Sequence, residues 1–367
     1  MGPRGTGRAP ELEGVSGKGQ TPAKEARVSI LTHHRRLLVF AAVAAVVATA
    51  LAAVGGTTKA APRAASLKVA LDWFPNPDHV ALYYALDKGL FKGQGVDVSM
   101  KTPSDPSAGL KLVATNKFDL AVYYEGDMFY AGQQGLPVIA VGALIPTPLN
   151  SMIAKPGSKI RALKDVKGAT IGNAGLPFDG AVLQTIRQQL HLGTNDVKSV
   201  NVGFNLVPAL LTGKVDAIIG GYWNIEAVKV KNVTGKQPVV FKMNQLGVPH
   251  YDELVIVANK NRLKSDSAYA SAVRSFLAGM VKGVDGARKN QSASIAILKK
   301  KSEYKTKDLT AMVPLTLKAL VSPSGVKTGC FSTADWQTFG SWMLKNKLLK
   351  KRVSVAAIQT NAYMAGC

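Results

Sequence analysis

The sequence predicts an α/β protein built from two doubly wound lobes with a ligand cleft between them. Three observations predict this class. From residue 67 onward, short apolar runs alternate with amphipathic segments, and this strand-and-helix order occurs twice along the chain. The chain then returns with one isolated strand and a series of helices, which predicts two crossovers between the lobes. Its 367 residues are enough for about two domains.

The first unit is predicted to alternate strands and helices around a mostly parallel sheet. Asn76 suits the N-cap of its first helix, Pro77 the first helical position, and Gly89 the end of that helix. Its strands are expected at 67–71, 96–100, 119–123 and 137–144, and its helices at 77–88, 106–115 and 126–134.

The second unit repeats this order and is followed by a largely helical segment. Its strands are expected at 170–173, 197–202 and 215–220, and its helices at 179–190, 207–212 and 224–230. A strand at 254–258 and helices at 267–289, 292–301, 309–321 and 333–345 then follow. Crossovers are expected near 145–152 and 245–253. We therefore expect lobe 1 to comprise 67–148 and 253–367, and lobe 2 to comprise 149–252.

Residues 1–66 differ in composition from the rest of the chain. Residues 1–30 are rich in Gly, Pro, Lys and Arg without periodicity, which predicts a disordered leader. A basic cluster at 33–36 precedes the apolar stretch 37–56, which suits a cleaved secretory signal or, if uncleaved, a membrane anchor. A buried core helix is the third alternative. The first two place the remainder of the chain outside the cytoplasmic membrane, on its outer face, in the periplasm or secreted.

The two cysteines, Cys330 and Cys367, lie in the part of the chain expected outside the membrane. A disulfide can persist there, and one between them would hold the C-terminal tail. Two free, buried thiols are the alternative.

Charge and motifs limit the function classes. The net charge of +23 suits nucleic acid, anionic lipid or an acidic cell wall. The Lys-rich runs at 299–301 and 350–352 lack interleaved aromatics, which favours a solvated face, and export argues against nucleic acid. The sequence has no phosphate-binding loop, no serine nucleophile elbow and no Cys/His metal cluster. We expect neither catalysis, nor a metal, nor a cofactor.

Ligands of such folds bind beyond the carboxyl ends of strands and between domains. Aromatic rings beside amides and carboxylates at these positions suit a flat, nitrogen-bearing ring. Each residue also has a purely structural alternative: Trp73 could line a core, His79 could bond the backbone, and Tyr123 and Tyr124 point to opposite faces. The candidate ligand-binding residues are Trp73, Asn76, His79, Tyr123, Glu125, Asn173, Asn205, Tyr222, Trp223 and Glu226.

Several segments resemble one family of binding proteins. The run Asp-Trp-Phe-Pro-Asn-Pro-Asp-His-Val at 72–80, Gly-Leu-Phe-Lys at 89–92 and Gly-Tyr-Trp-Asn-Ile-Glu at 221–226 are similar to the thiamine-pyrimidine-precursor binding proteins. These are substrate-binding proteins of ABC importers, related to nitrate, sulfonate and taurine receptors. The resemblance implies a type II periplasmic-binding fold in a monomer, hinge closure, and permease and ATPase partners.

The resemblance also implies a ligand of the formyl-aminopyrimidine or hydroxymethylpyrimidine type. Trp73 and either Tyr222 or Trp223 would stack on its ring, and Glu226 would pair with its amino edge. A receptor for riboflavin, a sulfonate or nitrate is the alternative within the binding class. A pyrimidine synthase of the same superfamily, which uses its own histidine and pyridoxal phosphate, requires a cysteine-rich iron motif that this sequence lacks.

Overall fold

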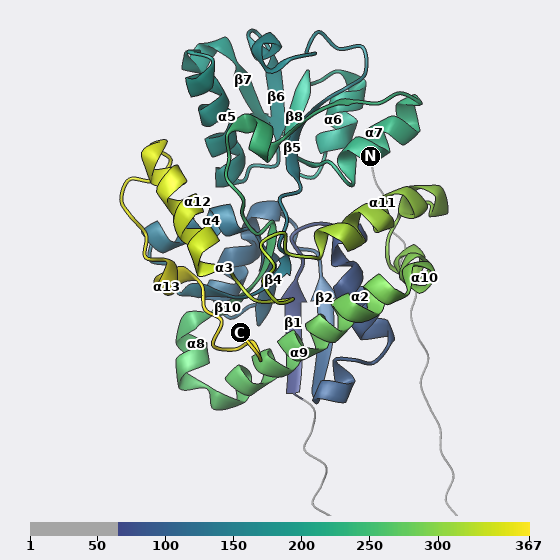
Figure 1. Cartoon of the computed structure of the whole chain (residues 1–367), viewed down its shortest axis with the longest axis vertical. Coiled ribbons are helices and arrows are strands. Elements are labelled where there is room, and N and C mark those ends of the chain that lie inside the picture. The colour runs from purple at the N-terminus through teal and green to yellow at the C-terminus, as the bar shows by residue number, and fades with distance from the viewer. Residues whose placement is uncertain (1–64) are drawn as a thin grey trace, which may run out of the picture. The chain divides into compact units, whose positions relative to one another are not determined.

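The computed structural model describes residues 65–367 (Figure 1). The predicted leader and the apolar stretch 37–56 lie outside the described residues. Two five-stranded sheets, ordered β2-β1-β3-β10-β4 and β7-β6-β8-β5-β9, form the centres of two lobes. Among residues 65–367, no helix has the length and apolar character that crossing a membrane requires.

The sheet of lobe 1 is parallel on one side and antiparallel on the other. β1 pairs in parallel with β2 and β3, and Val69 lies opposite Leu120. β10 runs antiparallel to both β3 and β4, and Val255 lies opposite Tyr123. The strands are β1 (Ala65–Ala70), β2 (Val96–Lys101), β3 (Leu120–Tyr123), β4 (Val138–Ile145) and β10 (Leu254–Asn259).

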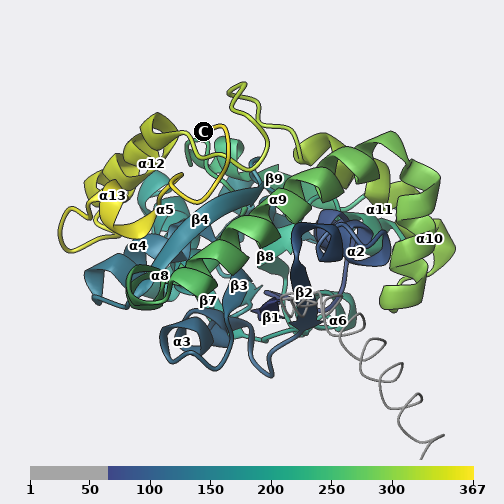
Figure 2. The same ribbon diagram turned by 90° about the horizontal axis from the view of Figure 1, so that it is seen from below.

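Helices cover this sheet on both faces. The segment expected as one helix over 77–88 is a 3₁₀ turn followed by an α-helix, with Asn76 capping the turn through its side chain. The longest helix, α9, crosses the lobe diagonally, and α12 and α13 lie near α4 (Figure 2). The helices are η1 (Pro77–His79), α2 (Val80–Asp87), η2 (Lys92–Gln94), η3 (Pro106–Ala108), α3 (Gly109–Ala114), α4 (Glu125–Gln133), α8 (Lys260–Ser265), α9 (Ser267–Lys289), α10 (Gln291–Lys301), α11 (Thr306–Ala319), α12 (Thr333–Lys345) and α13 (Val355–Ile358).

Lobe 2 contains two strands that the sequence pattern did not predict, β5 and β9. β5 runs antiparallel between β8 and β9, whereas β6 pairs in parallel with β7 and β8. The strands are β5 (Asn150–Ala154), β6 (Thr170–Asn173), β7 (Lys198–Asn201), β8 (Ala217–Tyr222) and β9 (Val239–Lys242). The helices are η4 (Leu163–Val166), α5 (Pro177–Gln189), η5 (Thr194–Asp196), α6 (Leu206–Thr212), α7 (Glu226–Thr234) and η6 (Met243–Leu246).

The chain passes between the lobes twice. β4 leads to β5 through 146–149, and β9 leads through η6 and 247–253 to β10. The predicted α/β fold with two lobes and two crossovers is therefore confirmed. Each returning strand, β5 and β10, enters its sheet antiparallel to its neighbours.

The C-terminal segment is tied to lobe 1. Cys330 and Cys367 are joined by a disulfide, with their Cα atoms 5.8 Å apart. Trp336 on α12 is fully buried and packs against Phe129 of α4 and against Phe331. Its indole Nε1 donates to the Asp252 carboxylate at 2.7 Å. The C-terminal helices therefore brace the second crossover.

Candidate functional site

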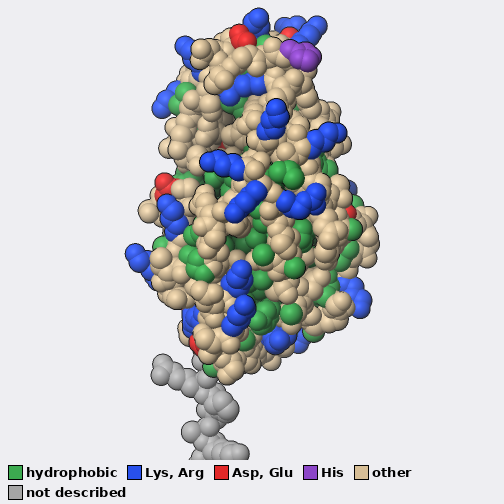
Figure 3. Space-filling view, turned by 90° about the vertical axis from the view of Figure 1, so that its left-hand side faces the viewer, with side chains coloured by type: hydrophobic (Ala, Val, Ile, Leu, Met, Phe, Trp, Pro, Cys, Tyr) green, Lys and Arg blue, Asp and Glu red, His purple; other side chains and the backbone are tan. Residues whose placement is uncertain are grey.

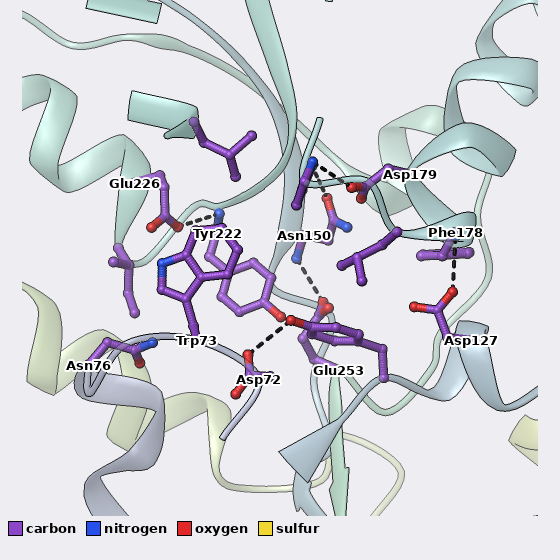
Figure 4. Close-up of a pocket in the computed structure, with 16 residues that line it drawn as sticks. Asp72, Trp73, Asn76, Asp127, Asn150, Phe178, Asp179, Tyr222, Glu226 and Glu253 are labelled. Atoms are coloured by element: carbon purple, nitrogen blue, oxygen red, sulfur yellow. Dashed lines mark hydrogen bonds between the residues drawn. The ribbon is translucent and has the colours of Figure 1, made fainter. Parts of the chain in front are cut away.

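A narrow cavity lies between the two lobes (Figure 4). Its walls come mainly from segments that follow the carboxyl ends of β1, β3, β6 and β8. The lining residues are Asp72, Trp73, Asn76, Tyr124, Asp127, Asn150, Ala174, Leu176, Phe178, Asp179, Leu206, Gly220, Tyr222, Ile225, Glu226 and Glu253.

The charge of this lining is opposite to the charge of the exterior. Lysine and arginine side chains are spread over the visible face, with few acidic ones (Figure 3). Within the described residues 65–367, no lysine, arginine or histidine lines the cavity, whereas its acidic residues are Asp72, Asp127, Asp179, Glu226 and Glu253. Such a lining accepts hydrogen bonds and attracts cations, and it disfavours anions.

Glu253 connects the two crossovers from inside the cavity. Its Oε2 accepts the backbone N–H groups of Leu149 at 2.6 Å and Asn150 at 2.7 Å. The Tyr251 hydroxyl donates to the same oxygen at 2.9 Å. Burial raises the pKa of Glu253 to about 7 despite these hydrogen bonds. The side chain thus positions the start of β5 against the start of β10.

Glu226 begins α7 and lies beside Trp73 at one end of the cavity (Figure 4). Its Oε2 accepts the Tyr222 backbone N–H at 2.8 Å, and burial raises its pKa to about 7. Its other oxygen remains available to a ligand. The first turn of a helix is favourable for a carboxylate, because the helix dipole is positive there.

Asp72 is oriented by His79 and Tyr124. His79 Nδ1 accepts the Asn76 backbone N–H at 3.3 Å, so its Nε2 carries the proton and donates to Asp72 Oδ1 at 2.7 Å. The Tyr124 hydroxyl donates to Asp72 Oδ2 at 3.1 Å. The prediction of His79 as a ligand-facing residue is wrong: the ring is fully buried outside the cavity and holds Asp72 in place.

The structure brings together four of the residues chosen from the sequence: Trp73, Asn76, Tyr222 and Glu226 line the cavity. Asn76 also caps η1, because its side-chain oxygen accepts the Asp78 backbone N–H at 2.8 Å. Tyr222 contributes its ring from the end of β8.

Two residues around the β3–α4 junction are placed wrongly by the sequence analysis. Tyr123 points to the opposite face of β3, where its hydroxyl donates to the Ser107 carbonyl at 3.3 Å, and the neighbouring Tyr124 lines the cavity instead. Glu125 is buried behind the cavity, where its Oε2 accepts the Asp252 backbone N–H at 2.7 Å. Both side chains serve the packing of lobe 1 and its crossover.

Three residues of lobe 2 also lie outside the cavity. Asn173 turns toward β7 and donates to the Ser199 hydroxyl at 2.8 Å. Asn205 is exposed at the start of α6. Trp223 packs on the first crossover, where its Nε1 donates to the Pro148 carbonyl at 3.0 Å. Tyr222, not Trp223, is therefore the aromatic residue that faces the cavity from this lobe.

Sequence reasoning missed four of the five acidic lining residues, which are Asp72, Asp127, Asp179 and Glu253. Asp127 and Asp179 each occupy the third position of a helix that directly follows a strand of the lobe. This spacing could have identified both residues, because the first turn of such a helix lies at the edge of the sheet where the strands end and ligands bind. Glu253 had no comparable signal, since it precedes an antiparallel strand whose orientation depends on long-range pairing. Residues 65–367 contain no group of three or more His, Cys, Asp or Glu residues arranged to hold a metal ion.

Comparison with known proteins places the chain in a family. The model of the family described as NMT1/THI5 like matches residues 76–294. The protein belongs to the NMT1/THI5-like family. A thiamine biosynthesis protein of Haemophilus influenzae is 39% identical over 56% of this chain, which spans 66%, just under two thirds, of that relative. The formylaminopyrimidine-binding protein of Halalkalibacterium halodurans is 27% identical over 78% of this chain and 87% of its own length.

Other similar proteins show that this family shares its fold with several receptors. The alkanesulfonate-binding protein of Xanthomonas axonopodis has a TM-score of 0.63 at 16% identity and covers 82% of this chain and 100% of its own. The nitrate-binding protein of Synechocystis has a TM-score of 0.63 at 11% identity, with 83% and 88% covered. The type II periplasmic-binding-protein fold is confirmed. A Schizosaccharomyces pombe relative, named a hydroxymethylpyrimidine phosphate synthase, is 28% identical over 41% of this chain and 43% of its own.

Proposed function

We propose that the protein is the extracytoplasmic solute-binding protein of an ABC importer and that it binds a thiamine pyrimidine precursor of the formyl-aminopyrimidine or hydroxymethylpyrimidine type. The observation that carries this proposal is the lining of the cavity: five acidic residues, aromatic rings and no cationic side chain. An aminopyrimidine offers N–H donors to the carboxylates and a flat face to Trp73 and Tyr222.

The same lining argues against the anionic alternatives. A nitrate or sulfonate would enter a buried space whose acidic residues repel it, and in the part of the chain that the structure describes no lysine or arginine lines the cavity to compensate. Charge does not exclude riboflavin, a neutral aromatic molecule, which therefore remains the alternative ligand. Glu226 beside Trp73 suits an exocyclic amino group, because its free oxygen can accept an N–H from the ring edge.

Contacts between the lobes suit a receptor that closes on its ligand. The rings of Trp73 and Phe204 meet across the cleft with centroids 4.6 Å apart. The Asn224 amide of lobe 2 donates to the Asp78 carboxylate of lobe 1 at 2.7 Å. A ligand that touches both lobes would stabilise this closed state over an open one, and the closed form would dock on a permease with its ATPase.

An enzymatic function analogous to the fungal synthases has less support. A synthase that uses its own histidine needs that histidine at the site. Within residues 65–367, His79 is occupied with Asp72 outside the cavity. We therefore favour stoichiometric binding, with the chain exported through the segment 37–56 as a signal or anchor.

A thermal-shift and tryptophan-fluorescence screen of the purified protein tests this function. The panel holds aminopyrimidine precursors, thiamine, riboflavin, taurine and nitrate. An aminopyrimidine at 100 times its Kd is expected to stabilise the protein by about 2.7 kcal/mol, and mass spectrometry should recover it unchanged. A response to taurine or nitrate alone, or conversion of the pyrimidine, would contradict the proposal.

A further inference from the structure

The end of the cavity away from Trp73 is built by two aspartates from opposite lobes. Asp127 is the third residue of α4 in lobe 1, and Asp179 is the third residue of α5 in lobe 2. Both side chains are 2% exposed. Figure 4 shows them on the same side of the cavity as Phe178, whereas Trp73, Asn76 and Glu226 lie on the other side.

The starts of α4 and α5 approach each other closely at this end. The Phe178 backbone N–H donates to Asp127 Oδ1 at 3.1 Å, so α5 contacts α4 directly across the cleft. A Cβ added to Gly126 would lie 2.6 Å from Cδ2 of the Phe178 ring, which leaves no room for a side chain there. The two aspartates are therefore held near one another only when the lobes are together.

Each aspartate has one oxygen occupied and one oxygen free. Asp179 Oδ2 accepts the Ala174 backbone N–H at 3.1 Å, and Asp127 Oδ1 accepts that of Phe178. The second oxygens, Asp127 Oδ2 and Asp179 Oδ1, are buried and have no hydrogen-bond partner in the part of the chain that the structure describes. Buried polar atoms are nearly always bonded, so two free oxygens in one cavity indicate a missing donor.

Among residues 65–367 no cation lies at this end, so without a ligand a proton held by one of the two carboxyl groups has to serve as the donor. Burial, followed by the charge of Asp179, raises the pKa of Asp127 to about 8. Burial raises the pKa of Asp179 to about 7, and the hydrogen bond from the Ala174 backbone N–H partly offsets this. The titratable groups that influence Asp127, or that it influences, are Asp179, Glu253, Tyr123, Tyr124 and Tyr130, all of them acids.

We propose that Asp127 and Asp179 form a subsite for a protonated amino group, so that the preferred ligand is an aminopyrimidine with a primary amine on its side arm. This inference rests on the proposed function. The ammonium group would donate to both free oxygens at once and would join α4 to α5. A hydroxymethyl side arm offers a single neutral O–H in place of the ammonium group, so it can donate to only one of the two oxygens.

Calorimetric titration of the purified full-length protein at pH 7.4 tests the subsite with two probes that differ in one group. These are 4-amino-5-aminomethyl-2-methylpyrimidine and its 5-hydroxymethyl analogue. The wild-type protein is expected to bind the aminomethyl compound about tenfold more tightly or better, the gain expected of a charge-assisted hydrogen bond. Binding should also release protons, measured as a dependence of the heat on buffer, because Asp127 must ionise.

Asp127→Asn and Asp179→Asn should each remove this preference, because the affinity for the aminomethyl compound falls further than the affinity for the hydroxymethyl compound. Asp127→Asn should also abolish the proton release, which a merely structural role would not change. Thermal unfolding of both variants checks that they fold, and they lie in different lobes. Equal wild-type affinity for both probes, or an equal loss for both in each folded variant, overturns the subsite while the proposed function stands. Binding of neither probe by the wild-type protein overturns both.

Discussion

Replacing Glu226 with glutamine is expected to weaken the binding of an aminopyrimidine by about 10- to 100-fold, which corresponds to the loss of one hydrogen bond to a charged group. Glutamine preserves the shape and can still accept the Tyr222 N–H, which Glu226 accepts at 2.8 Å. The NH₂ group of glutamine would then face the amino group of the ligand. Two donors cannot hydrogen-bond to each other, so this contact is lost. Calorimetric titration measures the difference.

Glu303→Gln is the matched control for that substitution. Glu303 is exposed and lines an adjacent outer groove rather than the cavity, so its neutralisation changes the overall charge equally. The affinity of the Glu303→Gln variant for the aminopyrimidine should stay within about twofold of the wild-type value, because exposed charges are screened by solvent. Wild-type affinity of the Glu226→Gln variant for the aminopyrimidine would show that other residues bind the ring.

The Trp336→Ala variant is expected to lose about 3–5 kcal/mol of unfolding free energy, the usual range for truncating a buried tryptophan. Trp336 is fully buried between α4 and the second crossover. Its removal leaves a cavity and also deprives the buried Asp252 carboxylate of the indole donor 2.7 Å away. Truncating this side chain of α12 should therefore destabilise lobe 1 and the second crossover that it holds.

Urea denaturation of the oxidised protein measures this loss. Trp342→Ala, on the same helix, provides the comparison, because Trp342 is only half-buried and packs against Phe339. The Trp342→Ala variant should lose clearly less unfolding free energy. A change below about 1 kcal/mol for Trp336→Ala would mean that α12 contributes little to the fold.

The fold class was predictable because parallel strands buried on both faces produce short apolar runs separated by helices. β5 and β9 were not predictable in the same way. β5 begins with Asn150 and Ser151 directly after the crossover, and its partner Tyr222 lies 72 residues further along the chain, as the register Asn150↔Tyr222 shows. A strand that is defined by such distant pairing has little local sequence pattern from which it could be predicted.

The sequence located the site near the carboxyl ends of the parallel strands, and four of the residues chosen there line the cavity, namely Trp73, Asn76, Tyr222 and Glu226. His79 and Glu125 come from the same segments, but their side chains turn into the protein interior. The acidic character of the lining depends on Asp127, Asp179 and Glu253, which come from separate segments that only the packing of the two lobes brings together.

One calorimetric experiment tests the central claim most directly, namely that a cation-free, acidic cavity between the lobes selects an N–H-donating ring over an anion. The purified protein is titrated at pH 7.4 with 4-amino-5-hydroxymethyl-2-methylpyrimidine and, separately, with ethanesulfonate. We predict one-to-one binding of the pyrimidine and no measurable heat with the sulfonate. Tight binding of the sulfonate together with no binding of the pyrimidine would contradict the account.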